Sequence, residues 1–405
     1  MDWINTPPPY PDEALESYLL RLTNHLGFPE YSDFAEEIWA LLVESTPDAF
    51  GNYPLSLHQA NIYRAKVASK LWAQGLLFVG KQRGVEESEL LKLALMHSKT
   101  VYSPNYKAVF RNGVDYPFAF LRKNHTPVCP ECIAESPYIR QHWQFLTHQV
   151  CHRHKVHLLT HCPSCHAQLD YQSSGSITYC ECGFDLTTAE TTEAGQCLIA
   201  LSQWLLGEKI AEQGMFALSL DIPARFGLLL WYTHRYGDKE NGDLTQCFTY
   251  FKTWPESLYD ELDEALQKGD AVRIQPWNKT TLSAVFGNLV KEARSLPSRD
   301  MSRNPILKAI AAYLSSLVHG HAGQHADNPS NMLVSTLEAS TLLGCTTDEV
   351  NRLNDHGYLQ TAFRLKLHEK IESHKPIYHL RDVMTLGITH MQSSTDGLNI
   401  FLPEW

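Results

Sequence analysis

The residues best suited to chemistry are thiols and imidazoles between positions 126 and 186, a stretch that holds seven of the ten cysteines. Cysteines separated by two intervening residues, as in Cys129-Pro-Glu-Cys132, allow a tight turn to direct both sulfurs at one ion. Two such half-sites complete a tetrahedron. Pairing the half-sites in chain order predicts two structural zinc ions, the first held by Cys129, Cys132, Cys151 and His154 and the second by Cys162, Cys165, Cys180 and Cys182.

Other uses of these thiols fit the pattern less well. Disulfides need an oxidising compartment, and a redox Cys-x-x-Cys motif is single and follows a strand. The ligand sets leave alternatives, because Cys180-Glu-Cys182 has one intervening residue rather than two, and four more histidines stand nearby: His152, His157, His161 and His166. Since every coordination position has a protein ligand, we expect the metal to hold a fold together rather than to activate water.

The composition is that of a folded protein with an acidic balance. The hydrophobic content is 43% and the net charge is −11, which opposes tight binding to DNA over a broad surface. The opening MDWINTPPPY has no basic and apolar leader, and nowhere do 18 apolar residues run together. These features predict a soluble, cytoplasmic protein with no membrane segment.

The charge is distributed unevenly along the chain. Residues 1–60 carry one basic and ten acidic side chains, whereas residues 61–126 carry eleven basic and four acidic ones. The basic segment either neutralises the acidic one within the chain or contacts nucleic-acid phosphates. For the second alternative, the candidate nucleic-acid-binding residues are Arg64, Lys66, Lys70, Lys81, Arg83, Lys107 and Arg111.

The first 100 residues are expected to be helical. Pro11, followed by two acids, starts a helix that ends at Gly27, and a second helix begins near Ser32, so the pair has the order of a helix-turn-helix. Two or three basic amphipathic helices follow, and residues 100–126 are expected to be irregular. Gly75-Leu-Leu-Phe-Val-Gly-Lys-Gln82 resembles a phosphate-binding loop, but it lacks the final Ser or Thr and is apolar where such a loop is exposed.

The pattern of residues 326–405 predicts a winged helix-turn-helix. One helix begins near Thr336 and ends at Gly344, and a second, from Asp348 to His356, is capped by Thr346 or Thr347. Residues 376–380 form the strand of the wing. The second helix would be the recognition helix, yet Arg352 is its only lysine or arginine beside three acids, so direct reading of DNA is unexpected.

These elements define a mainly α, multi-domain protein without a catalytic constellation, and we therefore expect no enzyme. The expected order is an N-terminal helical domain with a helix-turn-helix (1–125), tandem zinc-binding modules (126–190), a helical domain (191–325) and a winged helix-turn-helix-like domain (326–405).

Several motifs, in this order, resemble those of the TniQ family, the target-selection proteins of Tn7-like transposons. They are Pro9-x-Pro-Asp-Glu-x-Leu-Glu-Ser-x-Leu-x-Arg-Leu followed by Gly27, Cys129-Pro-x-Cys132, His142-Trp143 with Cys151-x-x-His154, and Cys162-Pro-x-Cys165. The Cys180-x-Cys182 spacing departs from the regular pattern.

The resemblance implies a non-catalytic DNA-integration adaptor that recruits an AAA+ ATPase and the transposase to target DNA. The short length and the acidic balance favour the CRISPR-associated kind, which docks as a homodimer on an RNA-guided Cascade complex. In that case base pairing by the guide supplies the specificity, and the adaptor touches target DNA mostly indirectly. The alternative is a guide-independent, sequence-specific DNA-binding protein that recognises a transposon attachment site.

Overall fold

The computed structural model describes residues 3, 5–45, 53–65, 69–82, 89–103, 106–237, 244–323, 327–364 and 371–395. These residues are mainly helical and divide into two compact units. The first unit comprises residues 1–211, 221–226 and 244–248, and the second comprises 212–220, 227–243 and 249–405. The prediction of a mainly α, multi-domain chain is confirmed, while the four finer domain boundaries remain predictions.

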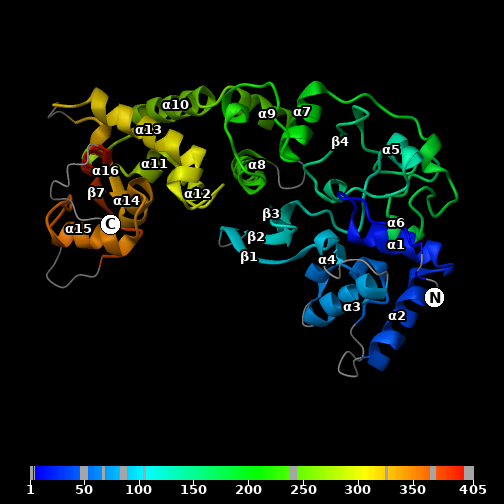
Figure 1. Ribbon diagram of the computed structural model, residues 1–405. Helices are drawn as coiled ribbons and strands as arrows, with labels where there is room; N and C mark the ends of the chain where they lie inside the picture. Colours follow the sequence, from blue (N-terminus) through cyan, green and yellow to red (C-terminus); the bar gives the residue numbers. More distant parts are fainter. Residues whose placement is uncertain are drawn as a thin grey trace. The chain divides into compact units, whose positions relative to one another are not determined.

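The N-terminal helices form as their sequence pattern predicts (Figure 1). α1 (Leu15–His25) is followed by Gly27, whose φ of 79° is the left-handed conformation that glycine adopts at little cost, and α2 (Tyr31–Ser45) begins four residues later. The next two helices are α3 (Ser69–Gln82) and α4 (Glu89–Leu93). Since α3 contains residues 75–82, the segment that resembled a phosphate-binding loop is helical.

The expectation of an irregular segment after residue 100, preceded only by helices, is wrong. Three strands form an antiparallel sheet in the order β1-β2-β3, with β1 (Met96–Ser103), β2 (Tyr106–Arg111) and β3 (Val114–Pro117). Asn112 and Gly113 make the two-residue turn, with φ of 45° and 85°. Positive φ at both positions matches the right-handed twist of the strands, and this is why Asn-Gly is a strong hairpin signal.

The metal-binding stretch is built from short elements joined by turns. They are α5 (Pro130–Glu135), a 3-10 turn η5 (Gln141–Gln144), the pair β4 (Val150–Cys151) and β5 (Val156–His157), and α6 (Tyr171–Ser174). α7 (Gln196–Leu205) follows within the first unit.

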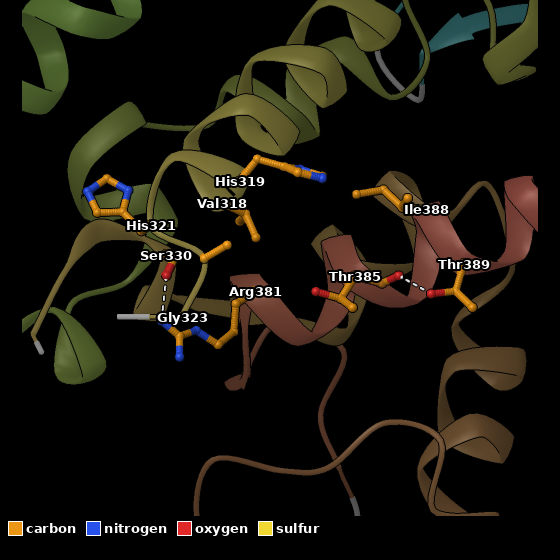
Figure 2. Close-up of a pocket in the computed structure, with 10 residues that line it drawn as sticks. Val318, His319, His321, Gly323, Ser330, Arg381, Thr385, Ile388 and Thr389 are labelled. Carbon is orange, nitrogen blue, oxygen red and sulfur yellow. Dashed lines mark hydrogen bonds between the residues drawn. The ribbon is translucent and has the colours of Figure 1, made fainter. Parts of the chain in front are cut away.

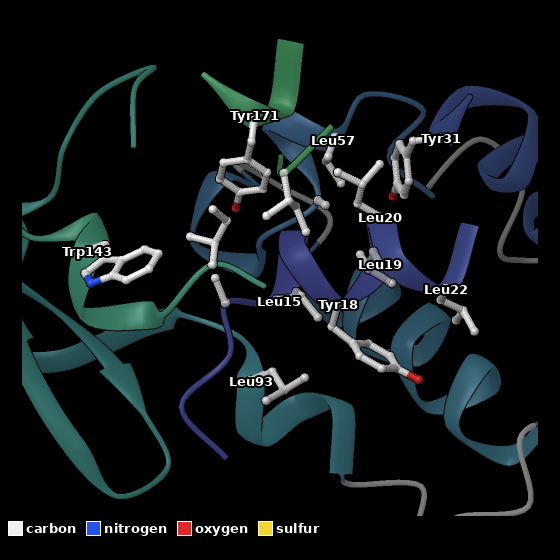
Figure 3. Packing of buried hydrophobic residues seen from close by; sticks show 14 of the residues in the cluster. Leu15, Tyr18, Leu19, Leu20, Leu22, Tyr31, Leu57, Leu93, Trp143 and Tyr171 are labelled. Atoms are coloured by element: carbon white, nitrogen blue, oxygen red, sulfur yellow. The ribbon is translucent and has the colours of Figure 1, made fainter. Parts of the chain in front are cut away.

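A single hydrophobic cluster joins the N-terminal helices to the metal-binding stretch. Leu15, Tyr18 and Leu19 of α1 are completely buried, and the same cluster contains Trp143, Cys129 and Cys132. Figure 3 shows α1 side chains among those of Tyr31, Leu57 and Leu93, with Trp143 and Tyr171 in the same view. Because burial of apolar surface is the main stabilising term of folding, the two stretches stabilise one another.

The middle of the chain is helical, as expected. α8 (Ile222–Tyr236) and α9 (Leu244–Lys252) are followed by α10 (Glu256–Val272), which begins directly after Pro255 and has an acid at its first position. The remaining helices of this region are α11 (Leu282–Phe286), α12 (Leu289–Ala293) and α13 (Pro305–Gly320).

The C-terminal part has the helices and the strand that the sequence predicts. α14 (Thr336–Leu343) and α15 (Thr347–Asp355) each start with a capping box, made by Ser335 with Glu338 and by Thr346 with Glu349. Gly344 ends α14 with a φ of 70°. β7 (Pro376–His379) pairs antiparallel with β6 (Leu333–Ser335), a strand that the sequence reading did not predict, and leads into α16 (Leu380–Thr395).

Candidate metal centres

The first cluster consists of Cys129, Cys132, Cys151 and His154, whose ligand atoms all lie within 4.8 Å of one another. Cys132 Sγ lies 3.5 Å from Cys151 Sγ and 3.2 Å from His154 Nδ1. Ligands placed at zinc–sulfur and zinc–nitrogen bond lengths around a tetrahedron are about 3.4–3.8 Å apart. The donor set therefore fits a four-coordinate metal ion.

Local structure brings these four residues together. Cys129 immediately precedes α5, whose first residue is Pro130, and Cys132 lies one turn further along that helix. Cys151 ends β4, and a turn through Lys155, at a φ of 61°, returns the chain to β5. The N–H of Lys155 donates to the carbonyl oxygen of Cys151 at 2.8 Å and closes this turn. The three thiols are at most 2% exposed.

His154 is oriented by a residue that the sequence analysis did not single out. Its Nδ1 faces the sulfur atoms, and its Nε2 lies 2.9 Å from a carboxylate oxygen of Glu135, the last residue of α5. The carboxylate accepts the Nε2 proton, so the Nδ1 lone pair is left for a metal. The same hydrogen bond lowers the pKa of Glu135. The sequence signal for this contact is the position of Glu135, an acid three residues after Cys132 and therefore on the same face of the helix.

The second cluster consists of Cys162, Cys165, Cys180 and Cys182, again with all sulfurs within 4.8 Å of one another. The Sγ atoms of Cys162 and Cys182 are 3.7 Å apart, as are those of Cys165 and Cys180. In contrast to the first cluster, Cys165 and Cys182 are exposed. This set of four sulfurs also fits a tetrahedral ion.

Tight turns explain how both half-sites of the second cluster close. The N–H of His166, at a φ of 59°, donates to Cys162 O at 2.9 Å, and Gly183, at a φ of 83°, donates to Cys180 O at 2.8 Å. The left-handed turn at Gly183 accommodates the single intervening residue of Cys180-Glu-Cys182. Burial raises the pKa of the Cys162 thiol, but backbone N–H groups of Cys165 and Ser164 outweigh it and lower that pKa to about 7.

The eight residues thus form two clusters in the structure. Each cluster contains the four residues that pairing in chain order predicts. The alternative ligands His152, His157, His161 and His166 belong to neither cluster within the described residues. His152 instead lies 4.0 Å from a carboxylate oxygen of Glu208. The donor chemistry fits a metal such as zinc at both clusters, and each ion would be held entirely by protein ligands.

A buried arginine lies beside the first cluster. Arg140 is 2% exposed, and its guanidinium stacks on the rings of Tyr138 and Trp143 at 4.6 and 5.1 Å. Its Nε is 3.6 Å from a carboxylate oxygen of Asp12, just before α1. Hydrogen bonds with the Cys129 and Cys151 thiols and burial raise the pKa of the Cys132 thiol, and the positive charge of Arg140 acts in the opposite direction. Arg140 therefore connects the segment before α1 to the metal-binding stretch.

Histidines near the first cluster are packed as neutral groups. His142 and His148 are buried with ring centroids 5.1 Å apart. Burial and the neighbouring positive groups lower the pKa of His148 to about 3. These rings fill the core and carry no charge at neutral pH.

The candidate nucleic-acid-binding residues have different surroundings. Lys70, Lys81 and Lys107 are exposed, and the Arg64 guanidinium lies 5.2 Å from the ring centroid of Tyr63. Lys66 and Arg83 lie outside the described residues.

Arg111 donates hydrogen bonds to three backbone carbonyl oxygens, those of Pro11, Glu13 and Lys92, at 3.0–3.2 Å. Burial lowers its pKa. These contacts favour a structural role for Arg111, which ties the sheet to the start of α1. Contact of the other residues with nucleic acid stays a prediction.

The structure is that of a mainly helical, multi-domain protein with two Cys/His clusters that are compatible with metal-binding modules. Residues 5–158 match the TniQ family model. The chain therefore contains a TniQ domain, and the resemblance predicted from the sequence motifs is confirmed over these residues. The matched stretch begins before α1 and includes the whole first cluster, whereas the second cluster follows it. Comparison with curated proteins gives no match.

A TniQ domain indicates a target-selection protein of Tn7-like transposition, a family of non-catalytic adaptors that interact with other transposition components. Within the part of the chain that the structure describes, none of the helices has the length and apolar character needed to cross a membrane.

Proposed function

We propose that this protein is a non-catalytic adaptor that marks target DNA for integration of a Tn7-like transposon in the bacterial cytoplasm. The observation that carries the proposal is the TniQ match over residues 5–158. That match covers α1 and the first cluster, which share one hydrophobic core. A scaffold stabilised by metal ions suits a protein that holds two partners in a defined arrangement and breaks no bonds itself.

The metal at both clusters is proposed to be zinc in a structural role. Three thiolates with one imidazole, or four thiolates, are the donor sets of structural zinc sites, and no position is left for a reactive water. Reduced thiols also suit the cytoplasm. Elemental analysis of protein purified without added metal tests this assignment: two zinc ions per chain are expected, and another metal or none would overturn it.

The adaptor is proposed to act as a homodimer on an RNA-guided Cascade complex and to recruit the AAA+ ATPase and the transposase. The charge of the C-terminal module supports partners other than DNA. The exposed part of α15 carries Asp348 and Asp355 beside Arg352, and Glu349 is partly exposed. Negative side chains on a recognition helix repel phosphates, so a protein partner is favoured.

Co-purification separates this proposal from its alternative. The tagged chain, co-expressed with the Cas proteins and crRNA of its own gene neighbourhood, is expected to remain bound to the complex in physiological salt and to shift naked DNA weakly. Failure to bind the complex, together with tight binding to one chromosomal site, would refute the guided mechanism.

The alternative is guide-independent recognition of an attachment site. The exposed Lys70, Lys81 and Lys107 in a basic segment favour it. In that case log Kd would depend steeply on log salt concentration, by roughly 0.9 for each phosphate contact. Replacing the three lysines with glutamine would reduce that slope by about 3. An unchanged slope would exclude these residues from the DNA interface.

A further inference from the structure

A pocket of about 300 Å³ opens between α13 and α16. It belongs to the second compact unit, whereas both Cys/His clusters belong to the first. Figure 2 shows side chains from the end of α13, from the segment before β6 and from α16 around this opening. The TniQ match does not account for the pocket, because the match ends at residue 158. The proposed adaptor role assigns no ligand to it.

The lining combines cationic and hydroxyl groups with a small apolar surface. Among the described residues that line the pocket, none is an aspartate or a glutamate. Asp382, next to Arg381 in the chain, does not line it; burial raises the pKa of that carboxyl, and the charges of His379 and Arg381 act in the opposite direction. The polar lining residues are His319, His321, Ser330, Arg381, Thr385 and Thr389.

Arg381 is held in place at one end of the pocket. Its Nη2 donates to Ser330 Oγ at 2.8 Å, and Ser330 Oγ in turn donates to Asn328 Oδ1 at 2.5 Å. Ser330 and Asn328 are at most 5% exposed. A guanidinium has five N–H donors in a rigid fork, so this anchored side chain arrives at the pocket already oriented.

The two histidines are oriented by their own helix end. His319 Nδ1 lies 3.1 Å from Ser315 O and His321 Nδ1 lies 2.8 Å from Leu317 O. A carbonyl oxygen only accepts hydrogen bonds, so each Nδ1 carries a proton. The Nε2 atom of each ring is then the nitrogen that can contact a ligand. A protonated histidine donates from both nitrogens. In Figure 2 the His319 side chain extends from α13 toward Ile388 of α16.

We propose that this pocket binds a phosphate group. A carboxylate offers two oxygens and one charge, whereas a terminal phosphate offers three acceptor oxygens and up to two charges. The phosphate is therefore the better partner for an arginine fork with histidines and the Thr385 hydroxyl around it, whereas the Thr389 hydroxyl already donates to Thr385 O at 2.9 Å. The volume exceeds that of a bare phosphate, and Val318 and Ile388 provide apolar contact for an attached sugar. The phosphate belongs either to a nucleic-acid backbone or to a free nucleotide.

Titration of the full-length, zinc-loaded protein tests the proposal. The probes are inorganic phosphate, AMP and a short oligonucleotide, followed by calorimetry and by ³¹P NMR of the two small probes. Saturable binding is expected, and Arg381→Gln is expected to weaken it at least tenfold, with a smaller loss in Arg381→Lys, which keeps the charge but not the fork. Arg352→Gln removes one charge from exposed α15 of the same unit and serves as the matched control.

The outcomes separate the sources of the phosphate. Binding of the oligonucleotide that depends on Arg381 assigns the pocket to a nucleic-acid backbone, and binding of AMP alone assigns it to a nucleotide. Absence of saturable binding to all three probes, equal binding by Arg381→Gln, or equal competition by an acidic peptide would overturn the proposal. If Arg381→Gln does not fold, Ile388→Trp, which fills the pocket while leaving Arg381 in place, is expected to abolish binding.

Discussion

Replacing Cys132 with serine tests the coupling between the first cluster and the N-terminal core. Cys132 is completely buried, and its sulfur lies 3.2 Å from His154 Nδ1 and 3.5 Å from Cys151 Sγ. A structural zinc ion contributes about 10–16 kcal/mol to the folding of small zinc modules. If the variant loses about half of this zinc contribution, the free energy of unfolding falls by roughly 5–8 kcal/mol, which is as large as the whole stability of many domains.

We therefore expect Cys132→Ser to bind one zinc ion rather than two and to lose the tertiary structure around the first cluster. Zinc content by elemental analysis measures the first effect. Tryptophan fluorescence, to which Trp143 in the same hydrophobic cluster contributes, reports the second effect. The N-terminal helices are expected to lose protection in hydrogen exchange, since α1 packs on this stretch.

The matched control is Cys247→Ser. Cys247 is also completely buried and belongs to the same compact unit, but it lies outside both clusters. Burying a hydroxyl there is expected to cost only about 1–3 kcal/mol and to leave two zinc ions bound. If Cys132→Ser kept two zinc ions and the unfolding temperature of the unmodified protein, the ligand assignment would be wrong.

Three further predictions concern the surroundings of the metal-binding stretch and the N-terminal helices. Glu135→Gln is expected to weaken zinc retention against a chelator by about 10–100-fold, whereas Glu131→Gln, on the exposed side of the same helix, should have no effect. Gly75→Ala is expected to destabilise the protein by about 1–3 kcal/mol in urea unfolding, because its Cβ would lie 2.6 Å from a ring carbon of Tyr53. Tyr53→Leu in the same chain should restore part of the loss, and a fully stable Gly75→Ala would contradict the packing. The pKa of His148 is about 3 when folded and about 6.5 when unfolded, so its contribution is present above pH 6.5 and is lost as the pH falls toward 3, by at most about 1.4 kcal/mol per pH unit. His148→Gln should flatten this part of the stability profile, and an identical profile would refute the buried neutral histidine.

Much of the helical structure follows from local sequence signals. Gly27 and Gly344 end helices in the left-handed conformation, and the capping boxes at Ser335 and Thr346 start α14 and α15. Such signals act within one turn of a helix, so they can be read without knowledge of the fold. The hairpin turn at Asn112-Gly113 is an equally local signal, and the expectation of an irregular segment overlooked it.

Other features depend on residues far apart in the chain. β6 pairs with β7 across more than forty residues, and Arg111 donates to the carbonyl oxygens of Pro11 and Glu13 nearly a hundred residues earlier. The charge pattern placed Arg111 among the candidate phosphate-binding residues. A charge pattern does not show which arginines donate hydrogen bonds to the backbone of their own chain. The hydrogen bond between His154 and Glu135 likewise joins residues that lie on separate elements of the chain.

The sequence by itself indicated two Cys/His clusters paired in chain order, because the short gaps within Cys-x-x-Cys and Cys-x-x-His constrain where the thiols and imidazoles can point. Tertiary structure alone decided that four neighbouring histidines remain outside the clusters, that Arg140 stacks between Tyr138 and Trp143, and that α1 shares its core with the first cluster. Covalent spacing restricts groups a few residues apart. Contacts between distant segments depend on which apolar surfaces are buried together, and that is settled only when the whole chain folds.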